Sequence, residues 1–310
     1  MDSASTSRSL SWRWWVCGLL LLATMINYMD RLTLSLLAKN ILLDLRLTER
    51  DYASVEAAFA IAFAIGGLFF GFIVDRWNVY WIYPLGLLGW SVAGFATGFA
   101  GGLTGLLLFR FLLGLMEASH WPCALRTTQH ILPPGERSMG NSILQSGAAL
   151  GAIVIPFVML ALFREDQPET WRRPFFVVGA VGAVWVFAWM TLLRPADLAP
   201  SPADSEEHHL QTPPLPRSLL IRRLAVLVVL VITINMTLHF LRAWGPLFLQ
   251  KVHGFTARQL FVFSIAYYAC TDIGALAAGF LTLRLTRGGL DIHLSQGTSR
   301  HRAVNRAKAK

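Results

Sequence analysis

Eight stretches of this chain are long and apolar enough to cross a lipid bilayer, and they constrain its fold more than any other feature. A span needs about 20 mostly apolar residues, because the hydrocarbon core is ~30 Å thick. Backbone amides without partners are not tolerated in lipid, so each stretch is expected to be an α-helix in an all-α membrane protein. The stretches lie near residues 12–38, 52–74, 79–100, 103–125, 138–162, 174–193, 222–249 and 258–283.

The composition agrees with a membrane protein and argues against several other classes. The 310 residues are 55% hydrophobic and only 15% charged. The three cysteines show neither a disulfide framework nor metal-ligand spacing, so we interpret them as apolar packing residues and predict no metal and no cofactor. The chain also lacks HExxH and other catalytic constellations. We therefore predict that it is not an enzyme and has no catalytic residues.

The distribution of charge predicts the domains and the topology. Residues 194–221 are rich in Pro, Ser, Asp, Glu and His and are expected to form a linker. Lys and Arg are about twice as frequent in segments that lie inside if the N-terminus is cytoplasmic. We thus expect a multi-pass protein of the inner (plasma) membrane with both termini in the cytoplasm. Its predicted parts are a cytoplasmic N-terminus (1–11), a six-helix transmembrane bundle (12–193), a cytoplasmic linker (194–221), a partial C-terminal bundle of two helices (222–287) and a basic cytoplasmic tail (288–310).

Much of the net charge of +9 lies in that tail, which contains Arg300, Arg302, Arg306, Lys308 and Lys310. No nucleic-acid-binding motif accompanies it, so the expected partner of the basic residues is the lipid bilayer and not a nucleic acid.

A short internal repeat links the two predicted bundles. Ile65-Gly66 matches Ile273-Gly274 at a shift of 208 residues, and Asn27 matches Asn235 at the same shift. This pattern is typical of a parallel duplication of a six-span unit. Within the first unit, Thr48 and Asp51 predict a capping box that opens the second helix.

Ionisable residues inside the spans are the first candidates for function, because a charge at bilayer depth costs about 2.5–3.5 kcal/mol on insertion scales. Arg110 and Glu117 are two helical turns apart and share a face, which indicates either a structural ion pair, within that helix or with a neighbouring one, or a proton site. Asp30 beside Arg31 allows the same interpretation. Arg31 and Arg242 are then expected to be free cations facing a cavity, where guanidinium groups suit a carboxylate substrate. The alternative for Arg242 is that it snorkels to the surface.

Other polar residues support weaker hypotheses. His120 and His239 are more typical of packing histidines than of ligands. Gly140, Gly147 and Gly151 are expected to allow close helix packing. Asp75 and Arg76, on a predicted cytoplasmic turn, form either a solvated pair or a conformational latch.

At these residues the chain resembles the major facilitator superfamily. Within it, the chain resembles the anion–cation symporter group, which includes the hexuronate, galactonate, sialic acid and vesicular glutamate transporters. The resemblance covers about residues 12–287 and rests on several strings taken together. They are Asn27-Tyr-Met-Asp-Arg31, Gly71-Phe-Ile-Val-Asp75-Arg76, Arg110 to Gly114 with Glu117-Ala and Trp121-Pro122, Pro134-Gly-Glu136-Arg137, Trp171-Arg-Arg-Pro-Phe175 and Arg242-Ala-Trp-Gly-Pro246.

The resemblance implies a complete N-terminal six-helix bundle, two helices of a C-terminal bundle and alternating access. It implies proton-coupled or cation-coupled symport of a small organic anion, with hexuronate-type sugar acids as the nearest match. It further implies a set of site residues. These are Arg31, Arg242, Tyr28, Gln145, Asn27 and Trp121 for the substrate, Asp30, Glu117 and Arg110 for proton coupling, and Asp75 and Arg76 for the latch.

Two departures lead to an alternative. The turn after the second span reads Trp77-Asn78-Val79-Tyr80 where the family usually has Gly and basic residues, so the latch is expected to be weaker. The family also has four further spans, and the sequence after Gly288 no longer resembles it. The alternative is therefore a truncated, non-transporting membrane fragment, with a complementing C-terminal fragment as its partner.

Overall fold

The computed structural model of the protein describes residues 10–198 and 217–287. The predicted basic tail, most of the predicted N-terminal segment and most of the predicted linker lie outside the described residues. The chain divides into two compact units, Met1–Ile265 and Ala266–Lys310. In the second unit, the described residues are the remainder of a helix that begins in the first.

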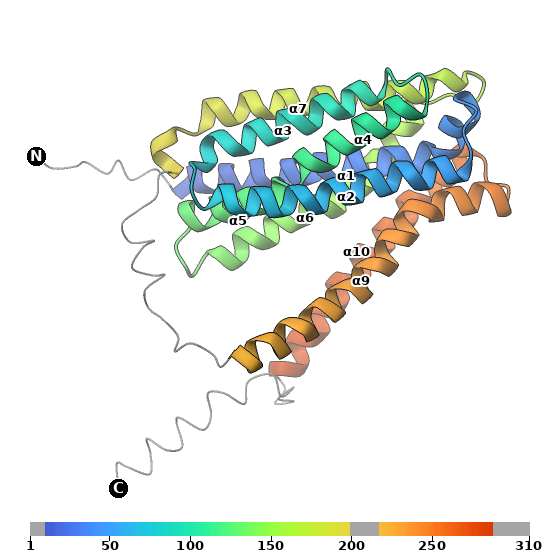
Figure 1. Cartoon of the computed structure of the whole chain (residues 1–310). Helices are drawn as coiled ribbons and strands as arrows, with labels where there is room; N and C mark the ends of the chain where they lie inside the picture. The colour runs from blue at the N-terminus through green and yellow to red at the C-terminus, as the bar shows by residue number, and fades with distance from the viewer. Residues whose placement is uncertain (1–9, 199–216, 288–310) are drawn as a thin grey trace, which may run out of the picture. The chain divides into compact units, whose positions relative to one another are not determined.

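The described chain is built from long helices, as the apolar stretches predict (Figure 1). They are α1 (Leu10–Asp44), α2 (Glu49–Val74), α3 (Val79–Thr97), α4 (Leu103–Glu117), α5 (His120–Ile131), α6 (Arg137–Leu162), α7 (Arg172–Leu192), α9 (Arg217–Val252) and α10 (Ala257–Arg287). Seven helical stretches of the described chain have the length and hydropathy of membrane spans, with α4 and α5 together forming one of them. The predicted eighth stretch, 258–283, lies within α10.

Helix α1 is the most buried of these seven spans. The most extensive helix contacts pair α1 with α6, α2 with α4, and α3 with both α7 and α4. Figure 1 shows these helices lying alongside one another. Charges on α1 and α4 are therefore held among helices and away from lipid, which is where polar groups in membrane proteins are tolerated.

Close approach of α1 and α6 depends on glycine, as the sequence predicts. A Cβ added at Gly147 would lie 2.2 Å from the backbone oxygen of Leu21, and one at Gly151 would lie 2.5 Å from that of Met25. The two glycines are one helical turn apart and both face α1. Small residues at this spacing let helix backbones approach closely in membranes.

The predicted fourth span is interrupted at Ala118 and Ser119, between α4 and α5. The cause is Pro122, which has no N–H for the carbonyl of Ala118 and whose ring crowds that carbonyl. The span then continues to Ile131, beyond its predicted end near residue 125. The interruption follows directly after Glu117 and sets this carboxylate at a helix end.

Helix α1 also ends later than predicted, at Asp44 instead of near residue 38. The carboxylate of Asp44 accepts a hydrogen bond from the Trp171 indole at 2.9 Å and pairs with Arg172 at 3.3 Å. These partners stabilise a polar helix end that apolar patterning alone does not reveal.

The backbone supports the internal repeat at its predicted shift of 208 residues. Thr48 and Asp51 form a reciprocal capping box at the start of α2, and Thr256 and Gln259 form the corresponding pair at the start of α10. The preceding turns also correspond, because Arg46 has φ 54° and Gly254 has φ 68°. The turns that lead into α2 and into α10 thus share one local backbone arrangement.

The two turns allow a matched stability test. An L-residue in the left-handed region is disfavoured by roughly 1–2 kcal/mol relative to Gly. We expect Arg46→Gly to raise, and Gly254→Ala to lower, the free energy of unfolding by about 1 kcal/mol each. Thermal unfolding of the purified protein in detergent measures both. The control is Gly101→Ala, which introduces no contact within 4 Å and no positive φ. An equal effect of Gly101→Ala and Gly254→Ala would contradict the backbone argument.

Candidate functional site

The candidate site is centred on an ion pair between α1 and α4. Arg31 Nε donates a hydrogen bond to Glu117 Oε1, and the side chains are 7% and 0% exposed. The expectation that Arg31 is a free cation is therefore wrong. Nor does Glu117 pair with Arg110, its neighbour along the same helix. The reason is tertiary: α1 and α4 bring together two charges that are 86 residues apart.

The Arg31–Glu117 pair leaves hydrogen-bonding capacity unused. Arg31 Nη2 and Glu117 Oε2 are both buried without a partner. Three aromatic rings surround the Arg31 guanidinium, with centroids 4.7 Å (Phe63), 5.3 Å (Phe59) and 5.9 Å (Tyr28) from its central carbon. Cation–π contacts of this kind hold the guanidinium in place while its outer nitrogen stays free. Tyr28 thus lies beside Arg31.

A second group of buried polar atoms surrounds this pair. Asn27, Asp30 and Arg110 are at most 2% exposed, and each has buried side-chain atoms without hydrogen-bond partners. Arg110 interacts electrostatically with both Asp30 and Glu117. Buried polar groups are nearly always hydrogen-bonded in native proteins, so a concentration of orphans indicates a place where a polar ligand is met.

The other predicted substrate cation, Arg242 on α9, also has a carboxylate partner. Its Nη2 lies 3.9 Å from Glu56 Oε2 on α2, and its Nε is buried without a hydrogen bond. The expectation of a free cation is thus corrected here too. The alternative that Arg242 snorkels to the surface also fails, since its side chain is only 17% exposed.

Glu56 and Tyr52 are site residues that sequence reasoning missed. The Tyr52 hydroxyl donates to the carbonyl of Ala243 at 2.8 Å and lies 3.5 Å from Glu56 Oε1. The signal for Glu56 was available, because it is a carboxylate inside the apolar stretch 52–74. No sequence signal identifies Tyr52, whose role depends on a contact between α2 and α9.

The remaining predicted residues lie farther from these contacts. Gln145 is exposed on α6, and Trp121 is half-buried with its ring 5.2 Å from that of His120. Asp75 and Arg76 are exposed at the end of α2. Arg76 Nη1 donates to the carbonyl of Phe72 at 3.0 Å and forms no ion pair with Asp75. The latch residues are therefore not paired with each other in this structure.

His120 is a packing histidine, as expected. It is fully buried, with Nε2 3.1 Å from Thr24 Oγ1 and Nδ1 3.0 Å from the Tyr83 hydroxyl. Both ring nitrogens of His120 therefore form contacts, one with α1 and one with α3.

Within residues 10–198 and 217–287, no group of three or more His, Cys, Asp or Glu side chains is arranged to hold a metal ion.

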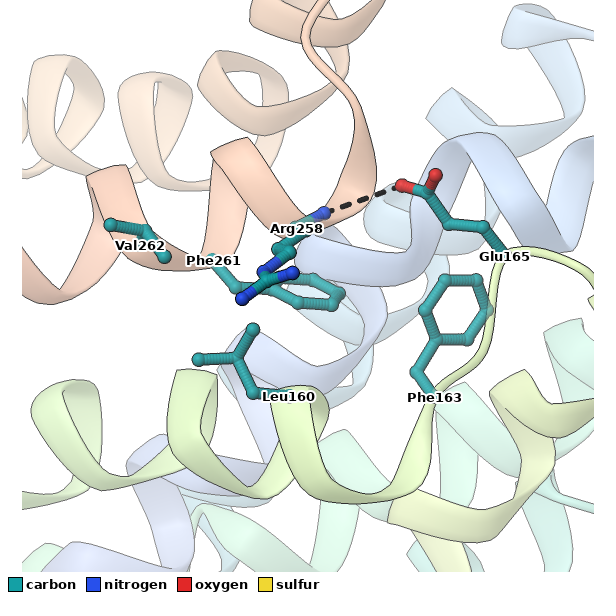
Figure 2. A pocket seen from close by; sticks show the side chains of 6 residues that line it. All are labelled: Leu160, Phe163, Glu165, Arg258, Phe261 and Val262. Atoms are coloured by element: carbon teal, nitrogen blue, oxygen red, sulfur yellow. Dashed lines mark hydrogen bonds between the residues drawn. The ribbon is translucent and has the colours of Figure 1, made fainter.

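Figure 2 shows a pocket where the end of α6 meets the start of α10. Its volume is about 440 Å³. Its lining includes Phe163, Phe261 and Arg258, and shares no residue with the charged cluster. Glu165 accepts hydrogen bonds from the backbone N–H groups of Ala257 and Arg258, at the N-terminus of α10. Negative charge at a helix N-terminus is stabilising, so this contact fastens α10 to the α6–α7 connection.

Long apolar helices around buried charges define a multi-pass membrane protein with a polar interior. Residues 20–290 match the sequence profile of the Major Facilitator Superfamily, and the chain belongs to this family. The predicted family and all-α fold are therefore confirmed. Membership in a family of transporters also confirms the prediction that the chain is not an enzyme.

Two relatives illustrate the similarity in sequence. The protein named Probable sulfoacetate transporter SauU, of Cupriavidus necator, is 26% identical over 91% of this chain and 67% of its own length. The Hexuronate transporter of Escherichia coli K12 is 24% identical over 87% of this chain and 65% of its own length. The chain thus spans about two thirds of the length of these relatives.

A solved structure shows the same fold. The crystal structure of a bacterial homologue of the human lysosomal transporter Spinster, in an inward-facing and occupied conformation, matches 90% of this chain and 63% of that chain. The TM-score is 0.74 at 21% sequence identity.

Proposed function

We propose that the chain acts in the secondary transport of a small organic anion, a sugar acid such as a hexuronate, coupled to protons by alternating access. The observation that carries this proposal is the buried cluster around Arg31 and Glu117, with unpartnered donors on Arg31, Arg110 and Asn27. Charges at this depth are costly and need a reason to be there. The names of the relatives, which refer to sulfoacetate and hexuronate, agree with an anionic substrate.

Arg31 is proposed to bind the substrate carboxylate. Its Nη2 has no partner, and its Nε is occupied by Glu117. A guanidinium binds a carboxylate best through two parallel N–H donors. The outer nitrogens Nη1 and Nη2 can supply these two donors while Glu117 keeps the Nε of Arg31, so the substrate and Glu117 then share one positive charge.

Glu117 is proposed to couple this binding to a proton. A protonated Glu117 no longer needs the positive charge of Arg31, which becomes available to the anion. Asp30 and Arg110 interact electrostatically with Glu117 and are proposed to share in this coupling. The other residues proposed to bind the substrate are Tyr28, Asn27, Trp121, Gln145 and Arg242.

We also propose a membrane topology and a conformational latch. The distribution of Lys and Arg supports cytoplasmic N- and C-termini in the inner membrane. Asp75 and Arg76 then lie on a cytoplasmic turn, where they are proposed to hold one conformation against the other half of the transporter.

Isothermal titration of the purified chain with D-galacturonate, D-galactonate and D-glucuronate tests the function directly. We expect at least one sugar acid to bind. Its affinity should fall by up to about tenfold for each unit by which the pH rises, because a proton is taken up with the anion. In Glu117→Gln the affinity should no longer depend on pH. The neutral sugar D-galactose is the control ligand, and equal binding of galactose and its acid would contradict the proposal.

A further inference from the structure

Glu56 lies where α2 contacts α9, and the proposed transport mechanism gives this residue no role. Its side chain is 17% exposed and lies 3.9 Å from the guanidinium of Arg242. On its own helix it faces the Tyr52 hydroxyl at 3.5 Å, and on α4 it interacts electrostatically with Arg110. His239 on α9 interacts with Arg242 and Arg31, so it belongs to the same charged surroundings.

The Glu56–Arg242 pair is looser than the pair at Arg31. Arg31 donates a hydrogen bond to Glu117, whereas Arg242 and Glu56 make an ion pair at 3.9 Å without a hydrogen bond between them. Arg242 Nε is also buried without a partner. An incoming carboxylate can therefore replace Glu56 at Arg242 without breaking a hydrogen bond.

The described cluster contains as many guanidinium groups as carboxyl groups, and Glu56 is needed for that equality. Its guanidinium groups interact with its carboxyl groups through a continuous set of electrostatic contacts. The positive members are Arg31, Arg110 and Arg242, and the negative members are Asp30, Glu56 and Glu117. Adding an anion to a buried neutral cluster leaves an uncompensated charge, which low-dielectric surroundings strongly disfavour. A proton that enters with the anion restores neutrality.

We propose that Glu56 is the internal counter-anion of Arg242 and that its negative charge sets how many protons must accompany each substrate anion. With Glu56 present, a monoanion enters with one proton and a dianion with two. Without the charge of Glu56, a monoanion enters alone. This inference rests on the proposed function, and it makes Glu56 a positioning residue that selects substrates by their charge.

Titration calorimetry in buffers of different ionisation enthalpy measures the protons taken up per anion bound. With D-galacturonate as the probe, we expect the wild-type chain to take up about one proton, Glu56→Asp about one and Glu56→Gln close to none. The matched control is Glu49→Gln on the same helix, which removes an exposed carboxylate paired with Lys251 at 2.5 Å and should leave the proton number unchanged.

A double variant separates charge from structure. Glu56→Gln combined with Arg242→Gln removes the pair together and weakens binding by the loss of Arg242, but each anion that still binds through Arg31 should again take up about one proton. This variant also serves if Glu56→Gln alone does not fold, since neutral substitutes for a buried ion pair are often tolerated. Equal proton uptake by Glu56→Gln and Glu49→Gln, or no recovery in the double variant, would overturn the role of Glu56 alone. Failure of the wild-type chain to bind any sugar acid would overturn the proposed function and this inference with it.

Discussion

Arg31→Lys is expected to lower the affinity of the chain for its sugar acid by about 100-fold, because hydrogen bonds to charged groups contribute about 1.5–3 kcal/mol each. Lysine retains the positive charge but offers a single nitrogen in place of a planar fork. The three N–H donors of that nitrogen diverge, so they cannot give the substrate carboxylate the two parallel hydrogen bonds that the fork offers. Calorimetric titration with D-galacturonate measures the loss.

The control for this substitution is Arg173→Lys at the start of α7, where the side chain is exposed. The two variants lose the same group, but only one loses it inside the buried cluster. We expect the Arg173 variant to bind like the wild type. Equal affinities of the two variants would show that the guanidinium of Arg31 does not hold the substrate. Retention of the folded state in Arg31→Lys is checked by thermal unfolding, since lysine still neutralises Glu117.

Most of the fold could be predicted because lipid restricts a chain so strongly. Length and apolar content alone locate the helices, since only helices satisfy the backbone within a span. The ends were less predictable. Asp44 extends α1 because Trp171 and Arg172 receive its carboxylate, and these residues are distant in sequence. The interruption after Glu117 was readable from Pro122, although the apolar pattern continues across it.

The members of the charged cluster could be predicted, but their pairing could not. A charge within a span is visible in one helix at a time, and this rule found Asp30, Arg31, Arg110, Glu117 and Arg242. Its partner depends on which helices pack together. Spacing along α4 left Arg110 and a residue of a neighbouring helix both open as partners of Glu117, and the packing of α1 on α4 supplies Arg31. Glu56 was overlooked because it lies near the start of its span, where charges usually face water.

The pairings change the meaning of the site. Two free cations would attract any anion, whereas two arginines already neutralised by glutamates admit an anion only when a glutamate is released or protonated. In the proposed function, specificity and proton coupling then have one physical origin, the charge balance of the buried cluster. The aromatic rings around Arg31 support this exchange, because they hold the guanidinium while its partner changes.

The geometry of the cluster depends on how closely α1 packs against its neighbouring helices. The contact between α1 and α6 can be tested by adding a single methyl group. Gly147→Ala is expected to destabilise the protein by about 1–3 kcal/mol, the usual range for overpacking. The added Cβ would lie 2.2 Å from a backbone carbonyl of α1, which cannot rotate aside as a side chain can. Thermal unfolding in detergent measures the effect.

Gly71→Ala on α2 is the matched control, because a Cβ at Gly71 has nothing within 4 Å. Alanine is favoured over glycine within a helix by about 1 kcal/mol, so the control should be as stable as the wild type or more stable. Gly147→Ala gains the same helix propensity and must still lose stability if the close contact matters. Because α1 carries both Asp30 and Arg31, the displacement should weaken sugar-acid binding as well. A Gly147 variant as stable as the Gly71 variant would mean that α1 and α6 can separate freely, and that the cluster does not depend on their contact.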